Sequence, residues 1–152
     1  IFTVLPELKM VHYQRRNSAF SNHTPSIFDW KKIFTMSEGV KPWLHMTGIT
    51  PMIADAPKMS WMLAMNAAIE LSVPITMDFN HRPQLGPLKN LWEIMLPYIS
   101  HLELLIISVG QLCALSKLCD CEALVPDADV AMMDVAWRTL MGAMREKWNV
   151  KR

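Results

Sequence analysis

The sequence has little cysteine and almost no net charge. Its three cysteines, Cys113, Cys119 and Cys121, have no second C-x-C pair and no histidine near them. A zinc site is therefore disfavoured, and free thiols in a reducing compartment are expected. The formal net charge of +1, without a block of like charge, gives no reason to expect a nucleic acid or a membrane surface as partner. Small molecules and other proteins stay open as partners.

Long apolar runs are missing as well. No stretch approaches the roughly 20 residues needed to span a bilayer, because Glu103 interrupts even the run at 102–107. With 51% hydrophobic residues among 152, one domain with a packed core is expected. The sequence starts at Ile1 inside an expected strand, without a basic leader or cleavage signature. We therefore expect that residues preceding Ile1 in the protein are missing from this sequence. A cytoplasmic location is expected, although an organellar transit peptide could have been lost there too.

The first residues are predicted to form a small β ribbon. Two β-favouring runs, at 1–5 and 9–15, are separated by a short break. Because side chains alternate along a strand, Tyr13 and Arg15 share a face. A phenol beside a guanidinium suits an oxygen-rich anionic ligand. The alternative is an exposed strand whose polar side chains are simply solvated.

The rest of the chain alternates strands and helices. Short, largely apolar runs predict strands near 43–47, 74–79 and 103–107. Apolar residues at helical spacing predict helices near 56–71, 87–99, 112–118 and 129–148. Such alternation is typical of an α/β fold with a mostly parallel sheet. No strand follows the last helix for it to cover, so Trp137 and Trp148 are expected to be partly exposed.

Polar residues gather where the strand near 74–79 ends. Asp78, Asn80 and Arg82 follow its apolar residues, and ligands of open α/β sheets collect beyond the carboxyl ends of the strands. The alternative is that Asp78 and Asn80 only cap and turn the chain, as such residues often do.

Three segments in register resemble the PfkB (ribokinase-like) family of carbohydrate kinases, especially its 2-keto-3-deoxygluconate kinase branch. Segment 11–19 is similar to a Y-x-R-x-x-S-A strand of the lid, 45–51 to an S-G-I-T-P turn, and 77–82 to a D-x-N-x-R strand end. The resemblance implies a three-layer α-β-α ribokinase-like parallel sheet, here incomplete. Residues 1–20 would be a partial β lid and 21–152 a partial core. ATP and Mg²⁺ are the cofactors that the family implies.

The resemblance also implies roles for individual residues. Tyr13 and Arg15 would reach from the lid to a sugar acid, and Ile49 would line its pocket. Asn80 would shape the strand end between sugar and phosphate, and Arg82 would hold the substrate's polar end. The lid would close over the sugar and exclude water. The implied partner is a small-molecule sugar or sugar acid, with a homodimer in the full-length protein.

The chain departs from the family on the phosphate side. Ser108 and Gln111 stand where the family has N-x-x-E, and they are the weak candidates for cofactor binding. A neutral amide cannot replace the carboxylate that organises metal and phosphates. The five glycines are isolated, so the family's G-A-G-D motif with its aspartate base has no counterpart. No catalytic residue and no metal ligand are expected in this chain, because phosphoryl transfer depends on positioned charge.

These observations predict the central segment of an ATP-dependent sugar kinase, acting on a sugar or a keto-deoxy sugar acid and inactive by itself. A non-catalytic ribokinase-like binding or scaffold protein is the alternative. A plain α/β domain without a ligand site is the third interpretation.

Overall fold

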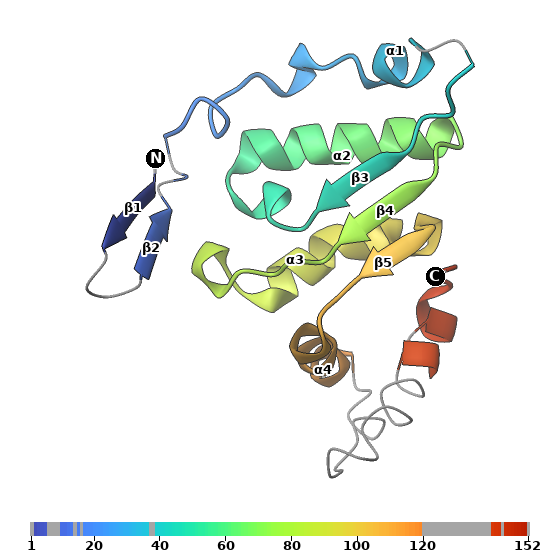
Figure 1. Ribbon diagram of the computed structural model, residues 1–152. Helices are drawn as coiled ribbons and strands as arrows, with labels where there is room; N and C mark the ends of the chain where they lie inside the picture. Colours follow the sequence, from blue (N-terminus) through green and yellow to red (C-terminus); the bar gives the residue numbers. More distant parts are fainter. Residues whose placement is uncertain are drawn as a thin grey trace.

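An N-terminal hairpin and a parallel sheet organise the molecule (Figure 1). They are seen in a computed structural model that describes residues 2–5, 10–13, 15, 17–36, 39–119, 141–143 and 145–151. In the hairpin, β1 (Phe2–Leu5) pairs antiparallel with β2 (Met10–Tyr13), and Phe2 lies opposite Tyr13. This pairing confirms the predicted ribbon.

The segment after the hairpin leads to two short helical turns. A single 3-10 turn, η1 (Pro25–Ile27), precedes α1 (Trp30–Thr35). Asp29 caps α1, because its Oδ1 atom accepts from the backbone nitrogen of Lys32 at 3.0 Å. The cap supplies an acceptor for one of the amides that a helix start leaves unpaired.

Three parallel strands form the sheet in the order β3-β4-β5. They are β3 (Leu44–Thr47), β4 (Ile75–Asp78) and β5 (Leu104–Ile106), each inside its predicted range. The register places Met46, Met77 and Leu105 side by side. Residues at one level of a parallel sheet share a face, so these side chains point to the same layer.

Helices connect the strands and cover that face. α2 (Asp55–Glu70) follows β3, and α3 (Leu88–Met95) follows β4. η2 (Thr50–Met52) and η3 (Pro83–Leu85) precede them, and η4 (Leu96–His101) extends α3 toward β5. Pro97 lies at the start of η4, where a proline ends regular α-helix. α4 (Val109–Leu118) begins three residues before the predicted 112. No helix among these described elements is long and apolar enough to cross a membrane.

The core lies between β4 and the helices α2 and α3. Ile75, Met77 and Phe79 are at most 1% exposed, and they belong to one cluster with Trp61 of α2 and Leu91 of α3. Burying a side chain of this size contributes about 1.5–3 kcal/mol. The buried strand therefore fixes the position at which the chain leaves the sheet.

The last described helical residues pack against the core, contrary to one expectation. Residues 141–143 and 145–148 are helical. The start of the predicted helix near 129–148, with Trp137, lies within 120–140, outside the described residues. Trp148 is only 7% exposed, so its expected exposure is wrong. Its ring lies 4.7 Å from that of Trp92 on α3, centroid to centroid. The helix packs on α3 and so does not need a further strand to bury this indole.

Candidate functional site

The ends of β3 and β4 approach each other closely. The backbone nitrogen of Gly48 donates to the carbonyl of Asp78 at 2.8 Å, and that of Phe79 donates to Ile106 at 2.9 Å. A Cβ atom added at Gly48 would come closer than 3.0 Å to the Phe79 carbonyl oxygen and would touch Leu91. Glycine is therefore needed where β3 leaves the sheet.

Thr47 links two of the predicted substrate-side residues. Its Oγ1 atom accepts from the backbone nitrogen of Ile49 at 3.3 Å and from Asn80 Nδ2 at 3.4 Å. Asn80 has a φ of 41°, in the left-handed region that asparagine tolerates. Ile49 and Asn80 are thus brought together at the edge of the sheet. Sequence reasoning missed Thr47, although it belongs to the segment at 45–51.

His81 and Arg82 follow Asn80 into η3. The Nε2 atom of His81 lies 2.9 Å from the carbonyl of Gly86, which closes the loop. Arg82 is exposed, and no described residue hydrogen-bonds or pairs with its guanidinium. An unengaged guanidinium can hold a carboxylate through two parallel hydrogen bonds. The position of Arg82 is therefore compatible with its predicted role.

Ser108 and Gln111 form the N-terminal cap of α4. The Ser108 hydroxyl accepts from the Gln111 backbone nitrogen, and Gln111 Oε1 accepts from the Ser108 backbone nitrogen, both at 3.4 Å. Gln111 Nε2 also donates to the carbonyl of His81 at 3.3 Å. Both ends of the Gln111 amide are thus used to tie α4 to the loop after β4. Gln111 therefore lies beside the loop that carries Asn80, while a role of Ser108 and Gln111 in cofactor binding stays a prediction.

The described residues at this edge would supply only one carboxylate to a Mg²⁺-nucleotide group. Mg²⁺ is usually bound through one or two carboxylates together with substrate phosphates. Asp78 supplies one half-buried carboxylate, while Ser108 and Gln111 are neutral and engaged with each other. No group of three or more histidine, cysteine or acidic side chains that could hold a metal occurs within the described part of the chain.

Tyr13 and Arg15 come from the hairpin. Tyr13 ends β2, and Arg15, two residues later, is half-buried. In Figure 1 the hairpin lies on the side toward which the arrows of β3 and β4 point. The hairpin and the carboxyl edge of the sheet therefore face the same side of the molecule. The convergence of Tyr13 and Arg15 with Ile49 and Arg82 on one cavity stays a prediction.

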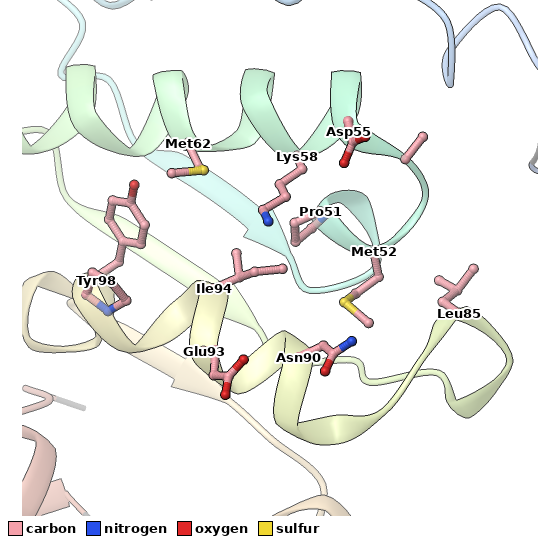
Figure 2. A pocket seen from close by; sticks show the side chains of 12 residues that line it. Pro51, Met52, Asp55, Lys58, Met62, Leu85, Asn90, Glu93, Ile94 and Tyr98 are labelled. Carbon is pink, nitrogen blue, oxygen red and sulfur yellow. The ribbon is translucent and has the colours of Figure 1, made fainter.

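A cavity of about 610 Å³ opens between α2 and α3. Lys58 reaches from α2 toward α3, and the Tyr98 hydroxyl points back toward α2 (Figure 2). Met52 of η2 and Leu85 of η3 line one end, so the cavity adjoins the loops that carry Ile49 and Arg82. None of the predicted site residues lines it. The sequence gives no signal for it, because its wall joins two helices far apart in the chain.

The phenol of Tyr98 is the group in this cavity whose ionisation is clearly perturbed. Burial raises the pKa of Tyr98 above its usual value of 10.0, and a hydrogen bond with Asn66 opposes that shift. Its ring also meets Trp61 edge-to-face at 5.3 Å, centroid to centroid. Tyr98 is thus a neutral hydroxyl at neutral pH, and it helps to pack α2 against η4.

Several solved structures resemble this chain. The 2-dehydro-3-deoxygluconokinase of Thermotoga maritima aligns with a TM-score of 0.75 and 24% identity, over 93% of this chain and 39% of its own. A PfkB family carbohydrate kinase of Listeria grayi aligns at 0.66 and 19%, over 93% and 38%. A PfkB protein of Polaromonas sp. JS666 aligns at 0.63 and 16%, over 91% and 43%.

This likeness confirms the predicted fold class, an incomplete ribokinase-like α/β fold with a parallel sheet. The chain spans about two fifths of the length of these proteins. No protein-family model matches the chain. No curated protein matches it either.

Proposed function

We propose that this chain is the substrate-side part of a PfkB-type carbohydrate kinase and binds a sugar acid such as 2-keto-3-deoxygluconate at the carboxyl edge of β3 and β4. The observation that carries the proposal is the cluster of Thr47, Ile49 and Asn80, held together by two hydrogen bonds and followed by the unengaged guanidinium of Arg82. The fold shared with carbohydrate kinases supports the same assignment.

The chemistry of the cluster suits a ligand with hydroxyls and one carboxylate. The hydroxyl hydrogen of Thr47 stays available, since its oxygen accepts from Ile49 and Asn80. The amide oxygen of Asn80 is a second group, one that can accept a hydrogen bond from a sugar hydroxyl. Arg82 would hold the carboxylate with its planar fork, which a lysine could not reproduce. Tyr13 and Arg15 of the hairpin would cover the bound sugar acid.

We further propose that the chain binds its ligand without transferring a phosphoryl group. ATP and Mg²⁺, when bound in a kinase, supply the transferable phosphoryl group and the charge that stabilises it. The described residues beside the cluster do not supply that charge, because Gln111 is neutral and its side-chain amide already forms hydrogen bonds with Ser108 and His81. The same observation favours the alternative function, a non-catalytic ribokinase-like binding or scaffold protein.

Ligand-observed NMR tests the binding proposal directly. We expect the chain to bind 2-keto-3-deoxygluconate with a dissociation constant of roughly 1 mM, about −4 kcal/mol, because an open site must order its loops on binding. The neutral sugar 2-deoxyglucose should bind at least about tenfold more weakly, since one charge-assisted contact is missing. Equal binding of the two sugars would contradict the proposed role of the guanidinium.

Two variants locate the site. Arg82→Ala should abolish the preference for the acid, whereas Lys41→Ala should keep it, because the exposed Lys41 precedes β3 at the opposite edge of the sheet. ADP release with ATP, Mg²⁺ and the sugar acid should stay at the level of a protein-free blank. Sustained turnover that Arg82→Ala removes would refute the non-catalytic part of the proposal.

A further inference from the structure

The cavity between α2 and α3 contains a lysine whose charge is not paired. Lys58 reaches from α2 into this space, where its side chain is half-buried (Figure 2). Within the described part of the chain, no hydrogen bond or ion pair involves its ammonium group. Partial burial of a charge costs free energy unless a partner replaces the lost water. An anionic group inside the cavity would be such a partner.

Two carboxylates stand at the rim of the same cavity. Asp55 belongs to the first turn of α2 and Glu93 to α3, and both residues are exposed. Neither forms an ion pair with Lys58, and Glu93 instead lies 3.8 Å from Lys89 of its own helix. The space between the helices therefore separates one cation from two anions. A small molecule that carries both charges can contact both kinds of group.

Apolar side chains form much of the remaining wall. Met52, Met62 and Ile94 line the cavity between the charged groups (Figure 2). Methionine side chains are flexible, so they can pack against apolar bodies of different shape. The volume of about 610 Å³ lies within the roughly 300–1,000 Å³ that is typical of small-molecule sites. The cavity thus combines room, an apolar wall and charges of both signs.

We propose that this cavity binds an apolar α-amino acid, such as leucine, in its zwitterionic form. The α-carboxylate pairs with Lys58, and the α-ammonium group pairs with the carboxylates of Asp55 and Glu93. The hydrocarbon side chain packs against Met52 and Met62. A sugar acid has a carboxylate but neither an ammonium group nor an apolar body, so it meets only one of these three demands. The site is therefore distinct in chemistry from the proposed sugar-acid site at the sheet edge.

Met52 connects the cavity to the loop after β4. A Cβ atom added at Gly86 would lie 2.9 Å from Met52 Cε, so the methionine packs directly on that glycine. The backbone nitrogen of Gly86 donates to the Pro83 carbonyl at 3.2 Å and so closes η3. A ligand that packs against Met52 is therefore expected to change the environment of the Gly86 amide.

NMR of the full chain, with ¹³C-labelled methionine methyl groups and uniform ¹⁵N, locates the ligand. L-leucine should shift the methyl signals of Met52 and Met62 and the amide signal of Gly86. Met59 is the internal control, because it is exposed on α2 but does not line the cavity. We expect a dissociation constant of roughly 1 mM, as an open site gives a small ligand little enclosure. Equal shifts at Met59 would mean non-specific contact and would overturn the site.

Three analogues of leucine test each contact separately. Isopentylamine lacks the carboxylate, 4-methylpentanoate lacks the ammonium group, and glycine lacks the apolar side chain. Each should bind about tenfold more weakly than leucine, because each loses one of the three contacts. If 4-methylpentanoate or isopentylamine binds as tightly as leucine, the cavity selects a single charge, and the zwitterion is refuted.

Two variants assign the charges to residues. Lys58→Met keeps an apolar stem and should abolish the preference for leucine over isopentylamine. A double variant with Asp55→Asn and Glu93→Gln should abolish the preference over 4-methylpentanoate. Lys32→Met is the matched control, because Lys32 is exposed on α1 outside the cavity, and it should keep both preferences. A preference over isopentylamine that survives Lys58→Met would contradict the assigned contact.

The proposal can fail without affecting the proposed function. The absence of any shift of the Met52 and Met62 methyl signals at about 10 mM leucine, tenfold above the expected dissociation constant, would refute the amino-acid site. None of these titrations contains the sugar acid, so that result would leave its proposed site untouched. Conversely, failure of the sugar acid to bind would not change the leucine titration.

Discussion

Replacing Gly48 by alanine should separate the ends of β3 and β4. The added Cβ would approach the Phe79 carbonyl oxygen to less than 3.0 Å and the Leu91 Cδ2 atom to 3.0 Å. Leu91 can shift its side chain at modest cost. The Phe79 carbonyl belongs to the backbone directly after β4, so it cannot move without moving the strand. The strain must therefore be relieved by displacing the chain at Gly48.

The size of the effect follows from the contacts that would be lost. Displacement would break the bond from Gly48 N to the Asp78 carbonyl, now 2.8 Å, and such a bond contributes about 1 kcal/mol. Overpacking a tight site costs about 1–3 kcal/mol in addition. We expect the free energy of unfolding to fall by about 2–4 kcal/mol, a large share of the roughly 5–15 kcal/mol typical of whole domains.

Urea unfolding followed by tryptophan fluorescence and circular dichroism measures this change. Gly110→Ala is the matched control, because nothing lies within 4 Å of a Cβ added there. Gly110 is in the first turn of α4, so alanine should leave stability unchanged or raise it by up to about 1 kcal/mol. Destabilisation of the Gly48 variant by less than about 0.5 kcal/mol, the scatter of ordinary surface substitutions, would refute the close-approach argument.

Two further predictions concern side chains that join elements. Gln111→Ala should lower the free energy of unfolding, measured by urea titration, by about 1 kcal/mol. The reason is that the substitution removes one of the two hydrogen bonds of the α4 capping box and the hydrogen bond to the His81 carbonyl. An unchanged urea midpoint would show that these bonds contribute nothing to stability. Because the pKa of Tyr98 is raised in the folded state, its contribution to stability is fully present below the ordinary value of 10.0 and lost as pH rises through the raised pKa. Tyr98→Phe should therefore show a smaller loss of stability above pH 10.0 than the wild type, and equal losses would contradict the burial of the phenol.

The sheet could be predicted because its strands are encoded locally. Residues 75–77 of β4 are all buried, and a largely apolar run with a β-branched threonine is typical of such a strand. The extent of α2 could be predicted as well, since apolar residues recur along it at helical spacing, although Met59, Leu63 and Leu71 of that pattern are exposed. Asp29 and Pro97 mark helix ends through chemistry that acts within one turn.

The details of the site depend on contacts between distant residues. Thr47 is an ordinary residue for the end of a strand, so nothing in the sequence around it indicates a role in the site. Its hydrogen-bond partner Asn80 is 33 positions away. Ser108 and Gln111 are different, because a serine three residues before a glutamine is a helix-start signature. That signature places the start of α4 at Val109, where the structure has it, rather than at 112.

The pairing of Trp92 with Trp148 gives the protein an internal optical reporter. The two indoles stand 4.7 Å apart with their planes inclined by 48°, a separation at which their electronic transitions couple. One indole belongs to α3 and the other to the last described helix. Detachment of that helix would therefore abolish the coupled far-ultraviolet band while the parallel sheet still gave its own circular dichroism signal. Docking of the carboxyl-terminal helix can thus be followed separately from unfolding, without attaching any label.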